Sequence, residues 1–89
     1  MRVSFDPDKH ERNLRERGFG FDYAALIFEG RTLEWPDRRR NYGEARIIAI
    51  GTVADDVMVV VYTDRDDTRR IISARLANTK ERKLWRQSR

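Results

Sequence analysis

Arginines lie on both sides of a short apolar stretch near the C-terminal end of the chain, in the segment RRIISARL (69–76). A strand that only had to pack would not need so many guanidinium groups, but the guanidinium fork matches a phosphate in a two-bond geometry. Because alternate residues of a strand point to opposite faces, we expect one open face and one face packed against helices. The open face would carry Arg69, Ile71, Ser73 and Arg75, and the packed face Ile72, Ala74 and Leu76.

A carboxylate and another arginine begin an earlier apolar run, EARIIAIGTV (44–53). Alternation places Glu44 and Arg46 on one face of this predicted strand. One explanation is that Glu44 and Arg75 simply pair across the sheet, as many ion partners do with little gain in stability. The other is a working face, on which arginines bind a phosphate beside a carboxylate.

The distribution of charge is uneven. The chain has 89 residues, a net charge of +4 and an estimated pI of 10.0. From Thr68 to Arg89 there is one acidic residue, Glu81, against eight basic ones: Arg69, Arg70, Arg75, Lys80, Arg82, Lys83, Arg86 and Arg89. A basic region of this kind is typical of contact with nucleic acid, although it also occurs where charge only maintains solubility.

Composition limits the class of protein. Apolar residues make up 39% of the chain, enough for the single core of one domain over residues 1–89. The absence of cysteine and the single histidine exclude disulfides, thiolate metal sites and histidine-cluster metal sites, so we expect no metal and no cofactor. We see no signal peptide, and the longest apolar run, Val57–Tyr62, is too short for a membrane span, which predicts a cytoplasmic protein.

Capping residues predict the helices. Asp6 and Pro7 suit the start of a first helix after a short strand (2–5), and Gly18 suits its end after Arg17. A second helix is predicted from Asp22, as its cap, to Glu29, and a final helix begins at Asn78 or Thr79. Residues 31–43 are the least regular, with a turn at 35–37 and a basic loop at 38–40.

Three apolar runs, 44–53, 57–64 and 69–76, are separated by acidic turns and predict an antiparallel meander with 57–64 at its centre. The predicted order is βααβββα, an α+β domain with helices packed on one face of an antiparallel sheet.

The chain resembles the BrnT family, the ribonuclease toxins of bacterial type II toxin–antitoxin pairs. The resemblance covers nearly the whole chain and rests on FDPDKHERNLRERG (with Lys9, Asn13 and Gly18), FDYAALIFEG, YGEARIIAIG, VVVYTDR and RRIISARLANTKER in this order. The family usually has histidine where this chain has Arg17, and often tyrosine where it has Trp85, so neither position enters the catalytic set.

The resemblance implies an RNA-cleaving fold similar to that of RelE toxins. It also implies RNA, in the first place mRNA, as substrate, and a BrnA-like ribbon-helix-helix antitoxin as partner, with operator DNA contacted only through the antitoxin complex. The alternative is a module without catalytic activity that uses the same basic surface to bind nucleic acid or only the antitoxin.

Metal-free RNA cleavage needs a base for the 2′-hydroxyl, cations for the phosphate and an acid for the leaving 5′-oxygen. We assign Glu44 as the base, oriented by Arg46, with Arg65 and Arg75 as phosphate clamps and Lys9 as a further cation or proton carrier. His10 is interpreted as a packing residue.

Other residues are expected to contact RNA along its length. Trp35 and Tyr42 flank the run Arg38–Arg40, and aromatic rings beside arginines can stack bases, although the loop could equally be a solvated one or meet an acidic part of the antitoxin. The predicted RNA contacts are Arg38, Arg39, Arg40, Tyr42, Arg69, Ser73, Lys80, Arg82 and Lys83.

Overall fold

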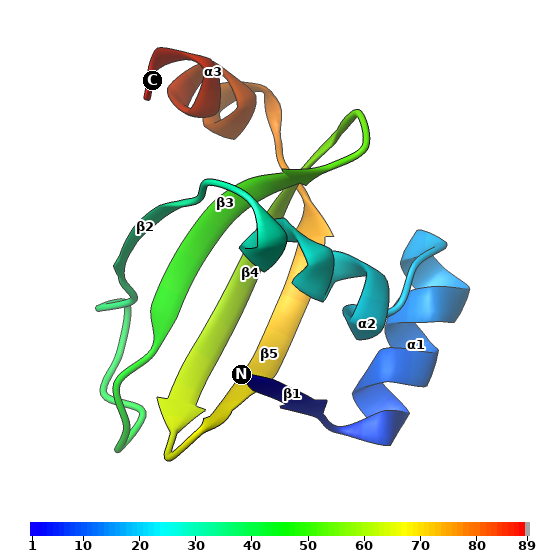
Figure 1. Ribbon diagram of the computed structural model, residues 1–89, viewed down its shortest axis with the longest axis vertical. Coiled ribbons are helices and arrows are strands. Elements are labelled where there is room, and N and C mark those ends of the chain that lie inside the picture. The colour runs from blue at the N-terminus through cyan, green and yellow to red at the C-terminus, as the bar shows by residue number, and fades with distance from the viewer. Residues whose placement is uncertain (89) are drawn as a thin grey trace.

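The most apolar strand of the chain lies at the centre of a five-stranded sheet, as Figure 1 shows. The computed structural model describes residues 1–88. Its elements are β1 (Arg2–Phe5), α1 (Pro7–Arg17), α2 (Phe21–Ala24), the 3₁₀ helix η1 (Ala25–Glu29), β2 (Leu33–Pro36), β3 (Ile47–Val53), β4 (Asp56–Arg65), β5 (Thr68–Leu76) and α3 (Thr79–Gln87). Within residues 1–88, no helix is long and apolar enough to cross a membrane.

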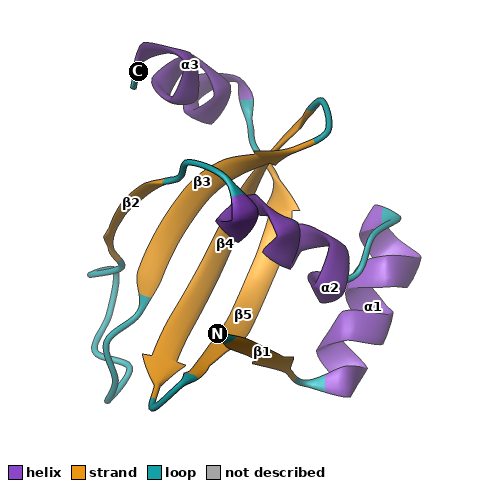
Figure 2. Cartoon of the chain, viewed as in Figure 1, coloured by secondary structure: helices purple, strands orange, loops and turns teal. Residues whose placement is uncertain are grey.

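The sheet has the order β1-β5-β4-β3-β2, and the predicted meander of β3, β4 and β5 is confirmed as antiparallel (Figure 2). β4 is buried without interruption from Met58 to Thr63, as a central strand covered on both faces must be. β1 adds to the outer side of β5 in parallel, so the first and last strands of the chain are neighbours at one edge of the sheet.

The caps of α1 and α3 confirm the sequence-based prediction. The Asp6 side chain accepts a hydrogen bond from the Asp8 backbone N–H, and Gly18 ends α1 with a left-handed φ of 84°. At α3, Asn78 and Glu81 form a capping box, in which each side chain accepts the backbone N–H of the other.

Three element predictions were wrong. The strand predicted over 44–53 begins only at Ile47, where pairing with Pro36 and Tyr62 starts. Residues 35–36, predicted as a turn, belong to β2, an edge strand on which the missing N–H of Pro36 is tolerated. The second helix begins at Phe21 rather than after a cap at Asp22, because Nδ1 of His10 accepts the Phe21 N–H at 3.0 Å. It then changes to a 3₁₀ helix at Ala25.

Apolar clusters cover both faces of the sheet. On one face, Phe21 and Ile27 pack against the inward residues of β3, β4 and β5, and α2 lies across the front of the sheet in Figure 1. On the other face, Trp85 of α3 packs against a cluster that contains Ile50 and Val59. The prediction of helices on one face was therefore wrong for α3. We call the second face, beyond the region that α3 covers, the open face.

A β-bulge at Ile72 changes the faces of β5. Val61 pairs with Ser73 and Tyr62 pairs with Ile71, so Ile72 is an extra residue opposite β4. Ile71 and Ala74 consequently lie in the same cluster under the helices. The face predicted for Ser73 and Arg75 is correct, whereas Arg69 and Ile71 lie on the helix-covered face and Ile72 on the open one, because alternation restarts at the bulge.

Candidate functional site

A hollow on the open face brings together four of the five residues predicted to be catalytic. Lys9, Glu44, Arg46 and Arg65 line a space of about 480 Å³, which we call the Glu44 hollow. The remaining lining residues are Ser4, Thr63, Asp66, Thr68, Arg70 and Ile72. These residues come from β1, α1, β4, the β4–β5 turn, β5 and the segment that connects β2 to β3, so the hollow exists only in the folded chain.

Two hydrogen bonds anchor the connecting segment at the hollow. The backbone N–H of Asp37 donates to the Arg46 carbonyl at 2.8 Å, which closes the segment where β2 ends. The Thr63 hydroxyl of β4 donates to the Ala45 carbonyl at 2.7 Å. The backbone around Glu44 is thereby fixed to the sheet even though it precedes the first residue of β3.

A tight turn directs Glu44 towards the sheet. Gly43 has a φ of 74°, a region that favours glycine, and its N–H donates to the Asn41 side chain at 3.0 Å. The Tyr42 ring lies 4.0 Å from the guanidinium carbon of Arg46. Tyr42 therefore stabilises the position of Arg46 by a cation–π contact.

Arginines hold the carboxylate of Glu44 on both sides. The Arg46 Nε donates to Oε2 at 3.0 Å, and the Arg65 guanidinium lies 3.9 Å from Oε1. Arg65 is 82% exposed at the side chain, against 27% for Glu44. A half-buried carboxylate with a fixed orientation, next to a cation free to contact a ligand, is suited to take a proton beside a bound anion.

Arg75 is separate from the hollow. Both of its terminal nitrogens donate to the Glu81 carboxylate at 2.7 Å, which joins β5 to α3. This pair raises the pKa of Arg75 and lowers the pKa of Glu81. Arg75 and Ser73 line a neighbouring groove that also contains Lys9. The predicted Glu44–Arg75 ion pair does not form, since each residue has a different partner.

Arg69 lies on the helix-covered face. Its guanidinium carbon is 3.9 Å from the ring centre of Tyr62 and 4.6 Å from that of Phe28. It donates two bonds of 2.8 Å to Asp64, and these bonds lower the pKa of that carboxylate. These contacts stabilise the helix-covered face, and they direct Arg69 away from the Glu44 hollow.

The remaining predicted RNA contacts lie at the rim of the open face and on α3. Arg39 donates two bonds to the buried Asp37, and this pairing lowers the pKa of Asp37 to about 2. Arg82 donates a hydrogen bond of 2.8 Å to the Ala77 carbonyl and therefore stabilises the start of α3. All cations of this set are exposed: Arg38, Arg39, Arg40, Lys80, Arg82 and Lys83.

Sequence reasoning missed Arg70, which lines the same hollow as Glu44. Strict alternation assigned it to the helix-covered face together with Ile72, and the bulge moves both to the open face. The sequence alone does not reveal the bulge, because Ile71 and Ile72 are both apolar; only the burial of both Ile71 and Ala74, which lie an odd number of positions apart, shows it.

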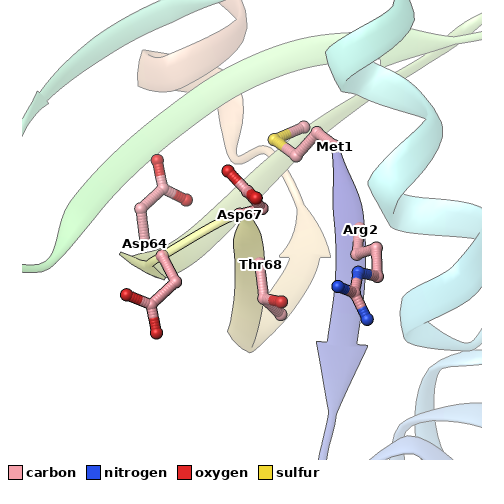
Figure 3. Close-up of a pocket in the computed structure, with 6 residues that line it drawn as sticks. Met1, Arg2, Asp64, Asp67 and Thr68 are labelled. Carbon is pink, nitrogen blue, oxygen red and sulfur yellow. The ribbon is translucent and has the colours of Figure 1, made fainter.

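A second hollow adjoins the first and is acidic. It lies at the β4–β5 hairpin, has a volume of about 530 Å³ and is lined by Met1, Arg2, Asp64, Asp66, Asp67 and Thr68 (Figure 3). Asp64 is already paired with Arg69, while Asp66 and Asp67 take part in no salt bridge recorded within residues 1–88, and these two carboxylates disfavour a polyanion here. We call this space the acidic hollow.

One known family matches most of the chain. The family described as the ribonuclease toxin, BrnT, of type II toxin-antitoxin systems matches residues 5–81. The chain belongs to the BrnT family. Membership gives it the role of a ribonuclease toxin, with RNA as its substrate and an antitoxin as its partner. A search of curated proteins finds no match to the chain.

The family match covers almost the whole Glu44 hollow. Residues 5–81 include every lining residue of the Glu44 hollow except Ser4. Trp85, where this chain departs from the usual BrnT pattern, lies outside the matched range. It packs over Ile50 and Val59, and Arg31 stacks on its ring at 4.0 Å, so its role in this chain is to hold α3 on the sheet.

Proposed function

We propose that this BrnT-family chain is an endoribonuclease that cleaves RNA in the Glu44 hollow without a metal ion. The observation that carries the proposal is that Lys9, Glu44, Arg46 and Arg65, which are far apart in sequence, line one hollow. Arg70 adds another cation to this set. A carboxylate surrounded by cations meets the two main needs of phosphodiester cleavage, a proton acceptor and stabilisation of negative charge.

The proposed reaction is attack of the RNA 2′-oxygen on the adjacent phosphorus. Glu44 takes the proton of the 2′-hydroxyl, a bond forms between the 2′-oxygen and phosphorus, and the bond from phosphorus to the 5′-oxygen breaks. Lys9 gives a proton to the leaving 5′-oxygen. The products are a 2′,3′-cyclic phosphate and a 5′-hydroxyl.

The arginines have different tasks in this proposal. Arg46 orients Glu44 through the bond of 3.0 Å, while Arg65 and Arg70 neutralise the charge that builds on the phosphate oxygens. Arg75, whose terminal nitrogens are already bound to Glu81, contributes its charge from the adjoining groove rather than a two-bond clamp.

The biological part of the proposal follows from the family. We propose that cleavage of mRNA inhibits translation in the cytoplasm, and that a BrnA-like ribbon-helix-helix antitoxin neutralises the toxin and alone contacts operator DNA. A likeness to RelE toxins in fold belongs to the same proposal. Expression of the chain should arrest growth, and co-expression of the protein encoded by the neighbouring reading frame should relieve the arrest.

Cleavage of an unstructured RNA in the presence of EDTA tests the reaction. Glu44→Gln and Lys9→Ala should each lower the cleavage rate by about 10²- to 10⁴-fold while the thermal unfolding curve is retained. Glu11→Gln and Arg15→Ala, exposed positions on α1 outside the hollow, are matched controls and should cleave at the parent rate.

Two other outcomes would contradict the proposal and indicate a different function. Tight RNA binding by the parent protein with no cleavage, even at high protein concentration, would indicate a nucleic-acid-binding module. No affinity for RNA would indicate that the basic surface serves only the antitoxin.

A further inference from the structure

A groove opens beside the Glu44 hollow, between α1 and the half of β5 that β1 leaves unpaired. β1 pairs with β5 only from Thr68 to Ile71, and beyond this point α1 lies next to the edge of β5 (Figure 1). The groove has a volume of about 380 Å³, and we call it the α1 groove. Its walls are Lys9, Arg12, Asn13, Glu16 and Arg17 of α1, Phe21 of α2, and Ile72, Ser73, Ala74 and Arg75 of β5.

The α1 groove is continuous with the Glu44 hollow. Lys9 and Ile72 line both spaces, so a chain molecule bound in one can pass directly into the other. On its other side, the Glu44 hollow shares Asp66 and Thr68 with the acidic hollow. The proposed reaction site therefore lies between a basic groove and an acidic hollow.

The charges of the α1 groove favour a polyanion. Arg12 and Arg17 are exposed, and within residues 1–88 the structure records no salt bridge to either. Glu16 is the single carboxylate of the lining. The spacing of these residues places them on one side of α1, which is the side that faces β5.

A bound RNA strand must leave the reaction site in some direction. Passage through the acidic hollow would bring phosphates next to the carboxylates that Figure 3 shows on the β4–β5 hairpin. Passage over Lys9 and Ile72 brings them next to guanidinium groups instead. Repulsion between like charges disfavours the first direction, and attraction between opposite charges favours the second.

We infer that single-stranded RNA runs from the Glu44 hollow over Lys9 and Ile72 into the α1 groove, where Arg12 and Arg17 bind the phosphates that follow the scissile one. This inference rests on the proposed ribonuclease function and adds to it a substrate path that the predicted site did not contain. The enzyme then selects single strands of several nucleotides over a single phosphodiester.

Binding measured over a range of salt concentrations tests the path. The probe is a single-stranded RNA of about ten nucleotides, bound to the Glu44→Gln protein so that it is not cleaved. For single strands, each phosphate contact contributes about −0.7 to the slope of log affinity against log salt. Arg12→Ala and Arg17→Ala should each make the slope shallower by about 0.7, whereas Arg15→Ala, on the same helix but outside the groove, should leave it unchanged.

Cleavage gives a second measure. In the otherwise unchanged protein, Arg12→Ala and Arg17→Ala should lower kcat/KM on the long RNA by about 10-fold each. Cleavage of a dinucleotide, whose only phosphate occupies the Glu44 hollow, should stay within about twofold of the parent rate.

The two proposals fail in different ways. If Glu44→Gln and Lys9→Ala abolish cleavage but Arg12→Ala and Arg17→Ala behave like Arg15→Ala, the α1 groove is not the RNA path and the ribonuclease proposal stands. If the parent protein cleaves neither substrate, the reaction proposal fails, and the salt slopes alone confirm or overturn the path.

Discussion

Arg69 and Arg70 are neighbours in the chain but lie on opposite faces of the sheet. Arg69 lies against two aromatic rings and is bound to Asp64, whereas Arg70 is exposed and lines the Glu44 hollow. The same residue type at adjacent positions therefore has a structural task in one case and a proposed binding task in the other. Substitution of each residue separates these tasks.

Arg69→Ala should lower the free energy of unfolding by about 2 kcal/mol, because it removes the two cation–π contacts and leaves Asp64 without its partner. Arg70→Ala should change this free energy by less than about 0.5 kcal/mol and lower RNA cleavage by about 10- to 100-fold. Urea denaturation and cleavage kinetics on both variants provide the comparison. An Arg70→Ala protein with unchanged cleavage would remove Arg70 from the site.

His10 is the other residue whose role can be separated in this way. It stacks on Phe5 at 4.8 Å and accepts the Phe21 N–H, so it holds α2 to the start of the chain. His10→Ala should lower the free energy of unfolding by about 1–3 kcal/mol. Cleavage per folded molecule should remain at the parent rate, and a loss of cleavage with the fold intact would contradict the structural role.

The residue types indicated the chemistry of the site, but they indicated less well on which face of the sheet each side chain lies. The sequence led to Lys9, Glu44, Arg46 and Arg65, which line one hollow in the structure, while their catalytic roles stay predictions. Alternation failed at Arg69 because an added residue in a strand has no local signature when isoleucines occupy the neighbouring positions.

At the scale of elements, the segment between β2 and β3 is the one that positions the proposed base. It has neither helix nor strand at Glu44, and its shape depends on the turn at Gly43 and the two anchoring hydrogen bonds at its end. Local backbone geometry in this segment should therefore affect activity more than stability.

Gly43→Ala tests this dependence. A Cβ at Gly43 would meet no atom within 4 Å, so the cost is only that of a positive φ, about 1 kcal/mol. We expect this loss in the free energy of unfolding, together with lower RNA cleavage from displacement of Glu44. Gly30→Ala is the matched control, because it has the same open space and an extended backbone, and its stability should be unchanged or up to about 1 kcal/mol higher.

Elements with strong local signals were predicted well, and elements fixed by distant contacts were not. The ends of α1 and α3 follow from Asp6, Gly18 and Asn78, whose side chain or backbone acts within one helical turn. β2 was missed because its strand geometry comes from pairing with β3, and Pro36 alone indicates a turn. The start of α2 depends on His10, which is 11 residues away in sequence.

At the scale of the whole molecule, three ion pairs between residues close in sequence are spread over the fold: Asp37 with Arg39, Asp64 with Arg69, and Glu81 with Arg75. Arginines lower the pKa of Asp37 to about 2 and also lower the pKa values of Asp64 and Glu81. The ordinary pKa values of these carboxylates are 3.8 for Asp and 4.5 for Glu, and the pKa values in the folded protein are lower. Between the two, the unfolded chain binds more protons than the folded protein. Stability from these pairs is fully present above this window and is lost as the pH drops through it.

Glu81→Gln should measure one part of this effect. At neutral pH the variant should be less stable by on the order of 1 kcal/mol, since it weakens the bond to Arg75 and the cap of α3. The difference from the parent protein should shrink as the pH falls below about 4. Urea denaturation between about pH 2 and 7 checks this, and a difference that stays constant throughout would contradict the lowered pKa of Glu81.

The parallel pairing of β1 with β5 also sets a time at which activity can begin. Arg2 pairs with Thr68, and 68 − 2 gives a separation of 66 residues, so this pairing must wait until most of the chain has left the ribosome. Lys9 follows β1, and Arg70 belongs to β5. A nascent chain therefore cannot assemble the hollow, and on the proposed mechanism RNA cleavage begins only when synthesis of each copy is nearly complete.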